Sequence, residues 1–77
     1  MKGLVYSSSI YRCEQYLKSK RLNKGEYLMV SPSNYQSLMG IETGTLAIRV
    51  NHDYTVGWCL LDSMIEERKF RIVEDTY

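Results

Sequence analysis

The sequence predicts an α/β fold, a minimal Rossmann-like layer with a mostly parallel four-stranded sheet and two main helices (β-α-β-turn-β-α-β). Short runs of β-forming residues alternate with two longer segments in which apolar residues recur every three or four positions. Each helical segment separates two predicted strands, and strands joined through a helix generally lie parallel with a right-handed crossover. Because the chain has 77 residues, we expect a single domain over residues 1–77.

The first half of the chain predicts two strands around one helix. Leu4-Val5-Tyr6 is an apolar run that ends at three serines, which suits a strand followed by a helix cap. The helix is expected over about residues 9–21, with Asn23 or Gly25 in the left-handed conformation that ends it. Its apolar face is formed by Ile10, Cys13, Tyr16 and Leu17. A second strand over residues 26–31 stops at Pro32, and a single helical turn is expected between residues 33 and 39.

The second half predicts a strand, a helix and a last strand. Gly40 and Gly44 bracket a turn before the strand 45–50. Asp53 or Thr55 can cap a helix over about residues 54–68. The apolar face of this helix is predicted from Val56, Cys59, Leu60 and Met64, with Trp58, Leu61 and Ile65 as further candidates. Residues 70–74 form the fourth strand. Two helices are too few to cover a sheet, so one face is expected to be partly uncovered.

Composition restricts the classes of function. The 10 Lys and Arg against 9 Asp and Glu give a net charge of +1, which offers no overall argument for nucleic acid or an anionic membrane. No stretch approaches the roughly 18 apolar residues of a membrane span, and the N-terminus turns polar at Ser7. We therefore expect a cytoplasmic protein without a membrane role. Cys13 and Cys59 lack the spacing of a metal site or disulfide framework and are predicted to be reduced core residues; no metal or cofactor is predicted.

A longer pattern supports a resemblance. The first strand ends in serines, a helix runs from Ile10 to Arg21, and Gly25 to Pro32 is followed by Leu38-Met39-Gly40. This arrangement, over about residues 4–50, resembles small bacteriophage-encoded Rossmann-like proteins, which are similar in turn to stripped-down P-loop folds. The resemblance implies a phage-type accessory or inhibitory protein that acts by binding. No Gly-x-x-x-x-Gly-Lys-Ser/Thr follows the first strand, so the pattern does not support nucleotide hydrolysis.

The carboxyl ends of the predicted strands carry polar residues, where open parallel sheets bind ligands. Ser8 and Ser9 at a helix start suit either a weak anion site or simple N-capping, and capping is the more economical reading. His52 beside Asp53 invites comparison with a Ser/His/Asp triad. The serines lack the Gly-x-Ser-x-Gly turn, however, and a thin layer offers few walls for a pocket. We predict that the chain is not an enzyme.

Aromatic residues make up 12% of the chain, including seven Tyr. Because Tyr and Trp are enriched where proteins meet proteins, the leading hypothesis is protein binding or self-association. It uses the less covered sheet face and an interaction surface that includes Tyr11, Tyr35, Tyr54 and Tyr77. The alternative is nucleic-acid binding, since backbone contacts combined with aromatic stacking bind single strands. The cluster for that alternative is Lys18, Lys20, Arg21 and Lys24, with Tyr16 and Tyr27 near it in sequence.

Overall fold

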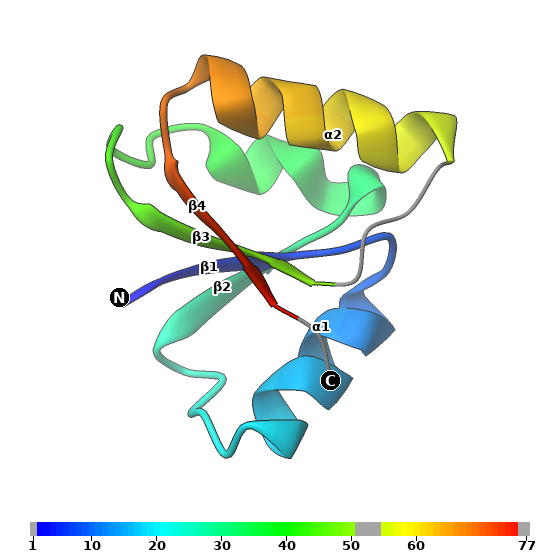
Figure 1. Cartoon of the computed structure of the whole chain (residues 1–77), viewed down its shortest axis with the longest axis vertical. Helices are drawn as coiled ribbons and strands as arrows, with labels where there is room; N and C mark the ends of the chain where they lie inside the picture. Colours follow the sequence, from blue (N-terminus) through cyan, green and yellow to red (C-terminus); the bar gives the residue numbers. More distant parts are fainter. Residues whose placement is uncertain (1, 51–54, 76–77) are drawn as a thin grey trace.

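The computed structural model describes residues 2–50 and 55–75. Its four strands form one sheet in the order β2-β1-β3-β4, and each neighbouring pair is parallel (Figure 1). The α/β layer predicted from the sequence is confirmed, and the mostly parallel sheet is parallel throughout the described strands. The strands are β1 (Gly3–Tyr6), β2 (Tyr27–Val30), β3 (Leu46–Val50) and β4 (Arg71–Asp75).

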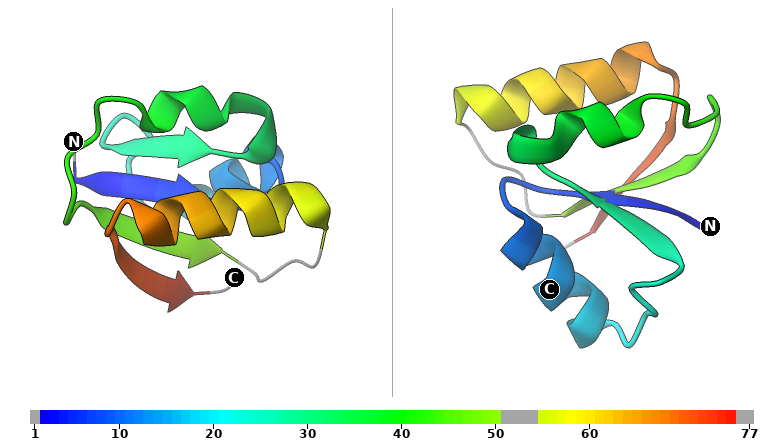
Figure 2. Two further views of the ribbon diagram at one scale, coloured as in Figure 1. Left: turned by 90° about the horizontal axis from the view of Figure 1, so that it is seen from above. Right: turned by 180° about the vertical axis from the view of Figure 1, so that it is seen from behind.

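Three helical elements lie on the two faces of the sheet. The helix α1 (Ile10–Ser19) packs on one face, whereas α2 (Val56–Glu67) and the 3₁₀ helix η1 (Pro32–Leu38) lie together on the other (Figures 1 and 2). The single turn predicted after β2 is therefore a seven-residue element. Ser31 and Asn34 form a capping box at its start, and Pro32 occupies the first helical position, where a missing N–H costs nothing.

Local chemistry accounts for the ends of α1 and the turn before β3. The Ser9 hydroxyl accepts a hydrogen bond from the Arg12 backbone N–H at 3.2 Å, which caps α1. The left-handed residue after α1 is Arg21, with φ of 57°, and not Asn23 or Gly25 as predicted. Gly40 and Gly44 have φ of 87° and 83°, so the predicted turn between them uses the conformational freedom of glycine.

The predicted apolar face of α2 was partly wrong. Trp58, Leu61 and Ile65 face the sheet and are buried. Val56, Cys59 and Leu60, which the sequence placed in the core, are exposed. The first half of the helix is apolar on both sides, so its periodicity does not identify the side that meets the sheet. On the sheet, α2 packs against Leu4, Tyr6, Val30 and Ala47, and Leu38 of η1 and Phe70 before β4 belong to the same apolar cluster.

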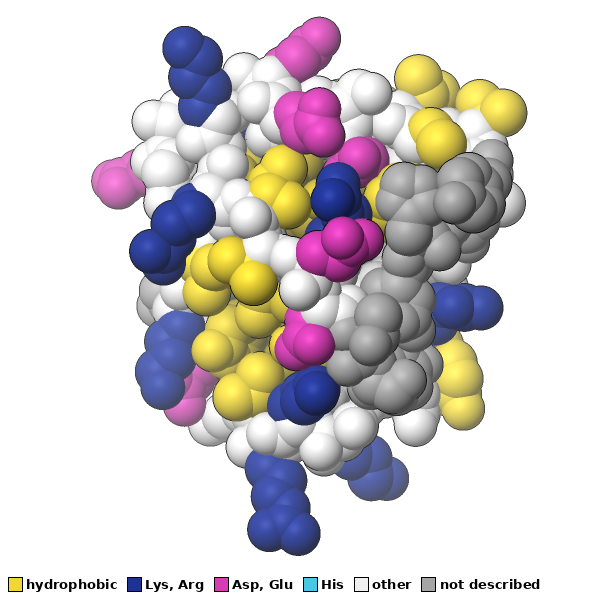
Figure 3. Space-filling view, in the orientation of Figure 1, with side chains coloured by type: hydrophobic (Ala, Val, Ile, Leu, Met, Phe, Trp, Pro, Cys, Tyr) yellow, Lys and Arg dark blue, Asp and Glu magenta, His cyan; other side chains and the backbone are white. Residues whose placement is uncertain are grey.

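A second apolar cluster lies between α1 and the sheet. It consists of Val5, Cys13, Tyr16, Leu17, Ile48 and Val50. Cys13 is buried as predicted, and burial raises the pKa of its thiol. Tyr27, Met29 and Leu46 pack against this cluster but are only partly buried, and Val73 on β4 is 47% exposed. Figure 3 shows apolar side chains on the surface over the sheet between β4 and α1.

Candidate functional site

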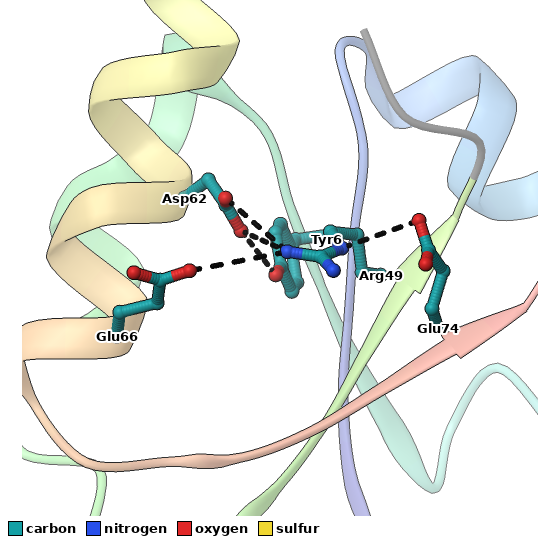
Figure 4. A network of polar contacts seen from close by, with 5 residues as sticks. All are labelled: Tyr6, Arg49, Asp62, Glu66 and Glu74. Carbon is teal, nitrogen blue, oxygen red and sulfur yellow. Dashed lines mark hydrogen bonds and ion pairs between the residues drawn. The ribbon is translucent and has the colours of Figure 1, made fainter.

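Polar side chains from three strands and α2 meet around Arg49 (Figure 4). Arg49 Nη1 on β3 lies 3.2 Å and 3.3 Å from the two carboxylate oxygens of Asp62 on α2. Tyr6 Oη on β1 donates a hydrogen bond of 2.6 Å to Asp62 Oδ1. Glu66 lies at the edge, 4.0 Å from Arg49 Nη1, and Glu74 Oε1 on β4 is 3.5 Å from Arg49 Nε. The network joins α2 to three strands.

Burial determines the chemistry of this network. The side chains of Arg49 and Asp62 are only 20% and 15% exposed, and Tyr6 is buried. Burial, followed by the hydrogen bond to Asp62, raises the pKa of Tyr6 far above its usual value. Tyr6 is therefore a neutral donor at any physiological pH. Because Arg49 lies within ion-pair distance of Asp62, Glu66 and Glu74, the arrangement is suited to fixing the position of α2.

Alkaline unfolding tests the state of Tyr6. A tyrosine whose pKa is raised by folding stabilises the folded chain. This contribution is fully present at a pH below 10.0, the pKa of tyrosine in the unfolded chain, and it is lost as the pH rises above 10.0 toward the folded-state pKa. Tyr16, whose pKa is raised by burial and then by Asp75, acts in the same direction. We expect urea denaturation at about pH 9 and about pH 11 to show a smaller loss of stability for Tyr6→Phe than for the parent chain. Equal losses would contradict the placement of Tyr6.

The serines at the strand ends are used within the fold. Ser7 is buried and its hydroxyl donates to the Ser9 carbonyl at 2.8 Å, while the Ser9 hydroxyl caps α1. The capping interpretation of Ser9 is thus confirmed. Anion binding at Ser8 and Ser9 stays a prediction. His52 and Asp53 lie outside the described residues.

The predicted basic cluster lies at the end of α1. Lys18, Arg21 and Lys24 are exposed. Lys20 Nζ is 3.8 Å from Asp75 Oδ2 and 6.0 Å from the centre of the Tyr16 ring. Tyr16 itself is buried, so its ring offers no open face on which a base could stack. All four cations of the cluster are exposed to solvent, whereas Tyr16 is buried and Tyr27 is partly buried. Nucleic-acid binding stays an untested prediction.

An apolar groove runs between η1 and α2, with a volume of about 510 Å³. A Cβ atom at Gly57 would lie only 3.3 Å from Pro32 Cβ, so glycine allows the two elements to approach at one end. Leu60 lines the groove and is 62% exposed. The lining residues are Pro32, Tyr35, Gly57, Leu60, Leu61, Ser63, Met64 and Glu67.

The tyrosines predicted to form an interaction surface are divided by the fold. Tyr11 and Tyr35 are both exposed, as expected. Tyr11 belongs to α1 and Tyr35 to η1, which lie on opposite faces of the sheet (Figure 2). They cannot belong to one contact patch. Tyr54 and Tyr77 lie outside the described residues.

Comparison with known proteins gives no assignment. No family model, no curated protein and no solved structure matches the chain. The resemblance to bacteriophage proteins is therefore neither supported nor contradicted. Within residues 2–50 and 55–75, no helix is long and apolar enough to cross a membrane, and no group of three His, Cys, Asp or Glu side chains is placed to hold a metal ion.

Proposed function

We propose that this chain is a small non-catalytic binding protein, of the accessory or inhibitory type, that holds apolar side chains of a protein partner in the groove between η1 and α2. One observation carries the proposal: the first half of α2 is apolar on the side that faces away from the sheet, where Val56 is 75% and Leu60 is 62% exposed. A helix on a protein surface usually turns polar residues to that side, and a helix that is apolar all round is usually covered on both sides.

The lining of the groove defines the kind of partner. Leu60, Leu61 and Met64 offer an aliphatic floor, and Tyr35 supplies an aromatic wall. A flexible methionine and an aromatic ring suit an amphipathic helix that inserts a few large side chains. The charged side chain of the lining is Glu67, at the carboxyl end of α2. A partner with aliphatic residues beside a Lys or Arg therefore matches this groove best.

Two synthetic peptides test this proposal. Both are amphipathic helices with the same leucine face, and one carries Lys where the other carries Glu beside that face. We expect fluorescence anisotropy to show tighter binding of the lysine peptide, because Glu67 attracts it. Leu60→Lys should weaken binding by at least about tenfold, since burying a leucine contributes more than the ~1.4 kcal/mol that a factor of ten requires.

Tyr11→Lys is the matched control, because it makes the same change of charge at an exposed position on the opposite face. It should leave peptide binding unchanged. Equal weakening by both substitutions, or no difference between the two peptides, would refute the groove as the binding site. The nucleic-acid alternative would be favoured by a different result: a labelled oligonucleotide binds, its affinity falls steeply with salt, and binding is lost when Lys18, Arg21 and Lys24 are replaced.

A further inference from the structure

Within residues 2–50 and 55–75, no strand pairs with the outer edge of β4. Among the described residues, β4 pairs with β3 alone, and no helix lies beside its other edge in Figure 2, where β4 is red. The Arg71 N–H donates to the Thr45 carbonyl at 2.9 Å, so the backbone groups of Arg71 point toward β3. The backbone groups of successive residues in a strand point alternately to its two edges. The N–H and C=O of Val73 and Asp75 therefore also point toward β3, whereas the N–H and C=O of Ile72 and Glu74 point to the outer edge.

We propose that β4 pairs antiparallel with β4 of a second copy of this chain, about a two-fold axis at Val73. Only outward-pointing groups can form the new hydrogen bonds. With the axis at Val73, Ile72 of each copy lies opposite Glu74 of the other, and each of these two pairs can exchange both backbone hydrogen bonds. An axis at Ile72 would place only one such reciprocal pair, Ile72 with Ile72, within the described strand.

Charge complementarity supports this register. Arg71, Val73 and Asp75 lie on the α1 side of the sheet, since alternate residues share a face and Tyr16 of α1 donates to Asp75 Oδ2 at 2.7 Å. In the proposed pair, Arg71 of each copy lies directly opposite Asp75 of the other. Opposite charges at directly facing positions of antiparallel strands attract, and like charges there repel. The charges of β4 are therefore complementary to those of a second β4 that runs antiparallel to it.

The centre of the pair is apolar. Val73 is 47% exposed, and in this register it faces Val73 of the second copy at a position without backbone hydrogen bonds, where facing side chains come closest. Leu46 and Ile48 extend the same apolar surface on the neighbouring strand. The pairing would join two four-stranded sheets into one and would leave the groove on the opposite face free. It is therefore independent of the proposed function.

The test compares the parent chain with two charge-reversal variants. Dimerisation is measured by analytical ultracentrifugation at protein concentrations from roughly 1 µM to 1 mM, because small edge contacts are weak. We expect Arg71→Glu to place two carboxylates opposite each other, and Asp75→Lys to place two cations opposite each other. Each variant alone should dimerise at least tenfold more weakly than the parent chain. An equimolar mixture should recover parental dimerisation, because every facing pair then has opposite charges. Arg12→Glu, the same charge change on α1, should dimerise like the parent.

A third variant keeps the test decisive if Asp75→Lys unfolds when its contacts with Tyr16 and Lys20 are lost. Val73→Lys places two ammonium groups at the axis and should also abolish the dimer while leaving Asp75 in place. A parent chain that stays monomeric at about 1 mM would overturn the proposal. So would a dimer that resists both Arg71→Glu and Val73→Lys, or two folded charge variants that fail to pair when mixed.

Discussion

Replacing Trp58 with alanine is expected to lower the free energy of unfolding by about 3–5 kcal/mol, the usual range for a large buried aromatic. The Trp58 side chain is buried between α2 and the sheet, and its ring stacks on Tyr6 with 6.1 Å between ring centres and 21° between planes. Native domains are stable by only about 5–15 kcal/mol. A chain of 77 residues should therefore lose most of its stability.

Urea denaturation followed by circular dichroism measures this loss. Val56→Ala is the control, because Val56 begins the same helix and is exposed. It should change the free energy of unfolding by less than about 0.5 kcal/mol, as expected for an exposed site. Comparable effects of the two substitutions would contradict the orientation of α2, and with it the exposure of the apolar side that carries the proposed function.

Asp62→Ala is expected to be the next most damaging substitution, at about 2–3 kcal/mol. Removing one partner of a fully buried ion pair costs about 3–5 kcal/mol, and here the two side chains are 15% and 20% exposed, which reduces the effect. The variant would leave the Arg49 guanidinium without its closest carboxylate and the Tyr6 hydroxyl without its acceptor. For a chain of this size we expect the melting temperature to fall by roughly 10 °C or more.

Glu66→Ala is the matched control for Asp62→Ala. Glu66 faces the same Arg49 from the next turn of α2, but its side chain is 60% exposed and the separation is 4.0 Å. Exposed pairs of this kind contribute little. The double variant Arg49→Met with Asp62→Leu should recover part of the lost stability, because it removes both charges together but leaves the Tyr6 hydroxyl without its acceptor. A loss for Asp62→Ala no greater than for Glu66→Ala would show that the network does not hold α2.

The order of the elements could be predicted because the local signals agree. Apolar and polar residues of α1 occupy distinct faces, so the buried Cys13, Tyr16 and Leu17 were identified from periodicity alone. The strand order β2-β1-β3-β4 was not predicted, because it depends on contacts between residues distant in sequence. The left-handed conformation of Arg21 was also not predicted. Asn and Gly are the residues that usually adopt this conformation after a helix, and here an arginine adopts it.

The candidate site was harder to predict than the fold. The first half of α2 is apolar on both sides, so Leu60 was assigned to the core and the groove was not foreseen. The ionic network was also missed, because Tyr6 and Asp62 are 56 residues apart. A signal was present in the sequence nonetheless. Arg49 interrupts an apolar strand and Asp62 interrupts an apolar helix, and a charge in such a position generally has a partner.

Methyl-resolved NMR of the chain during titration with the lysine peptide tests the central claim most directly, because it locates the contact as well as detecting it. The account predicts that the methyl signals of Leu60, Leu61 and Met64 shift together, and that those of Ile48 and Val73 on the opposite face stay unchanged. Shifts confined to Ile48 and Val73, with Leu60 unaffected, would contradict it.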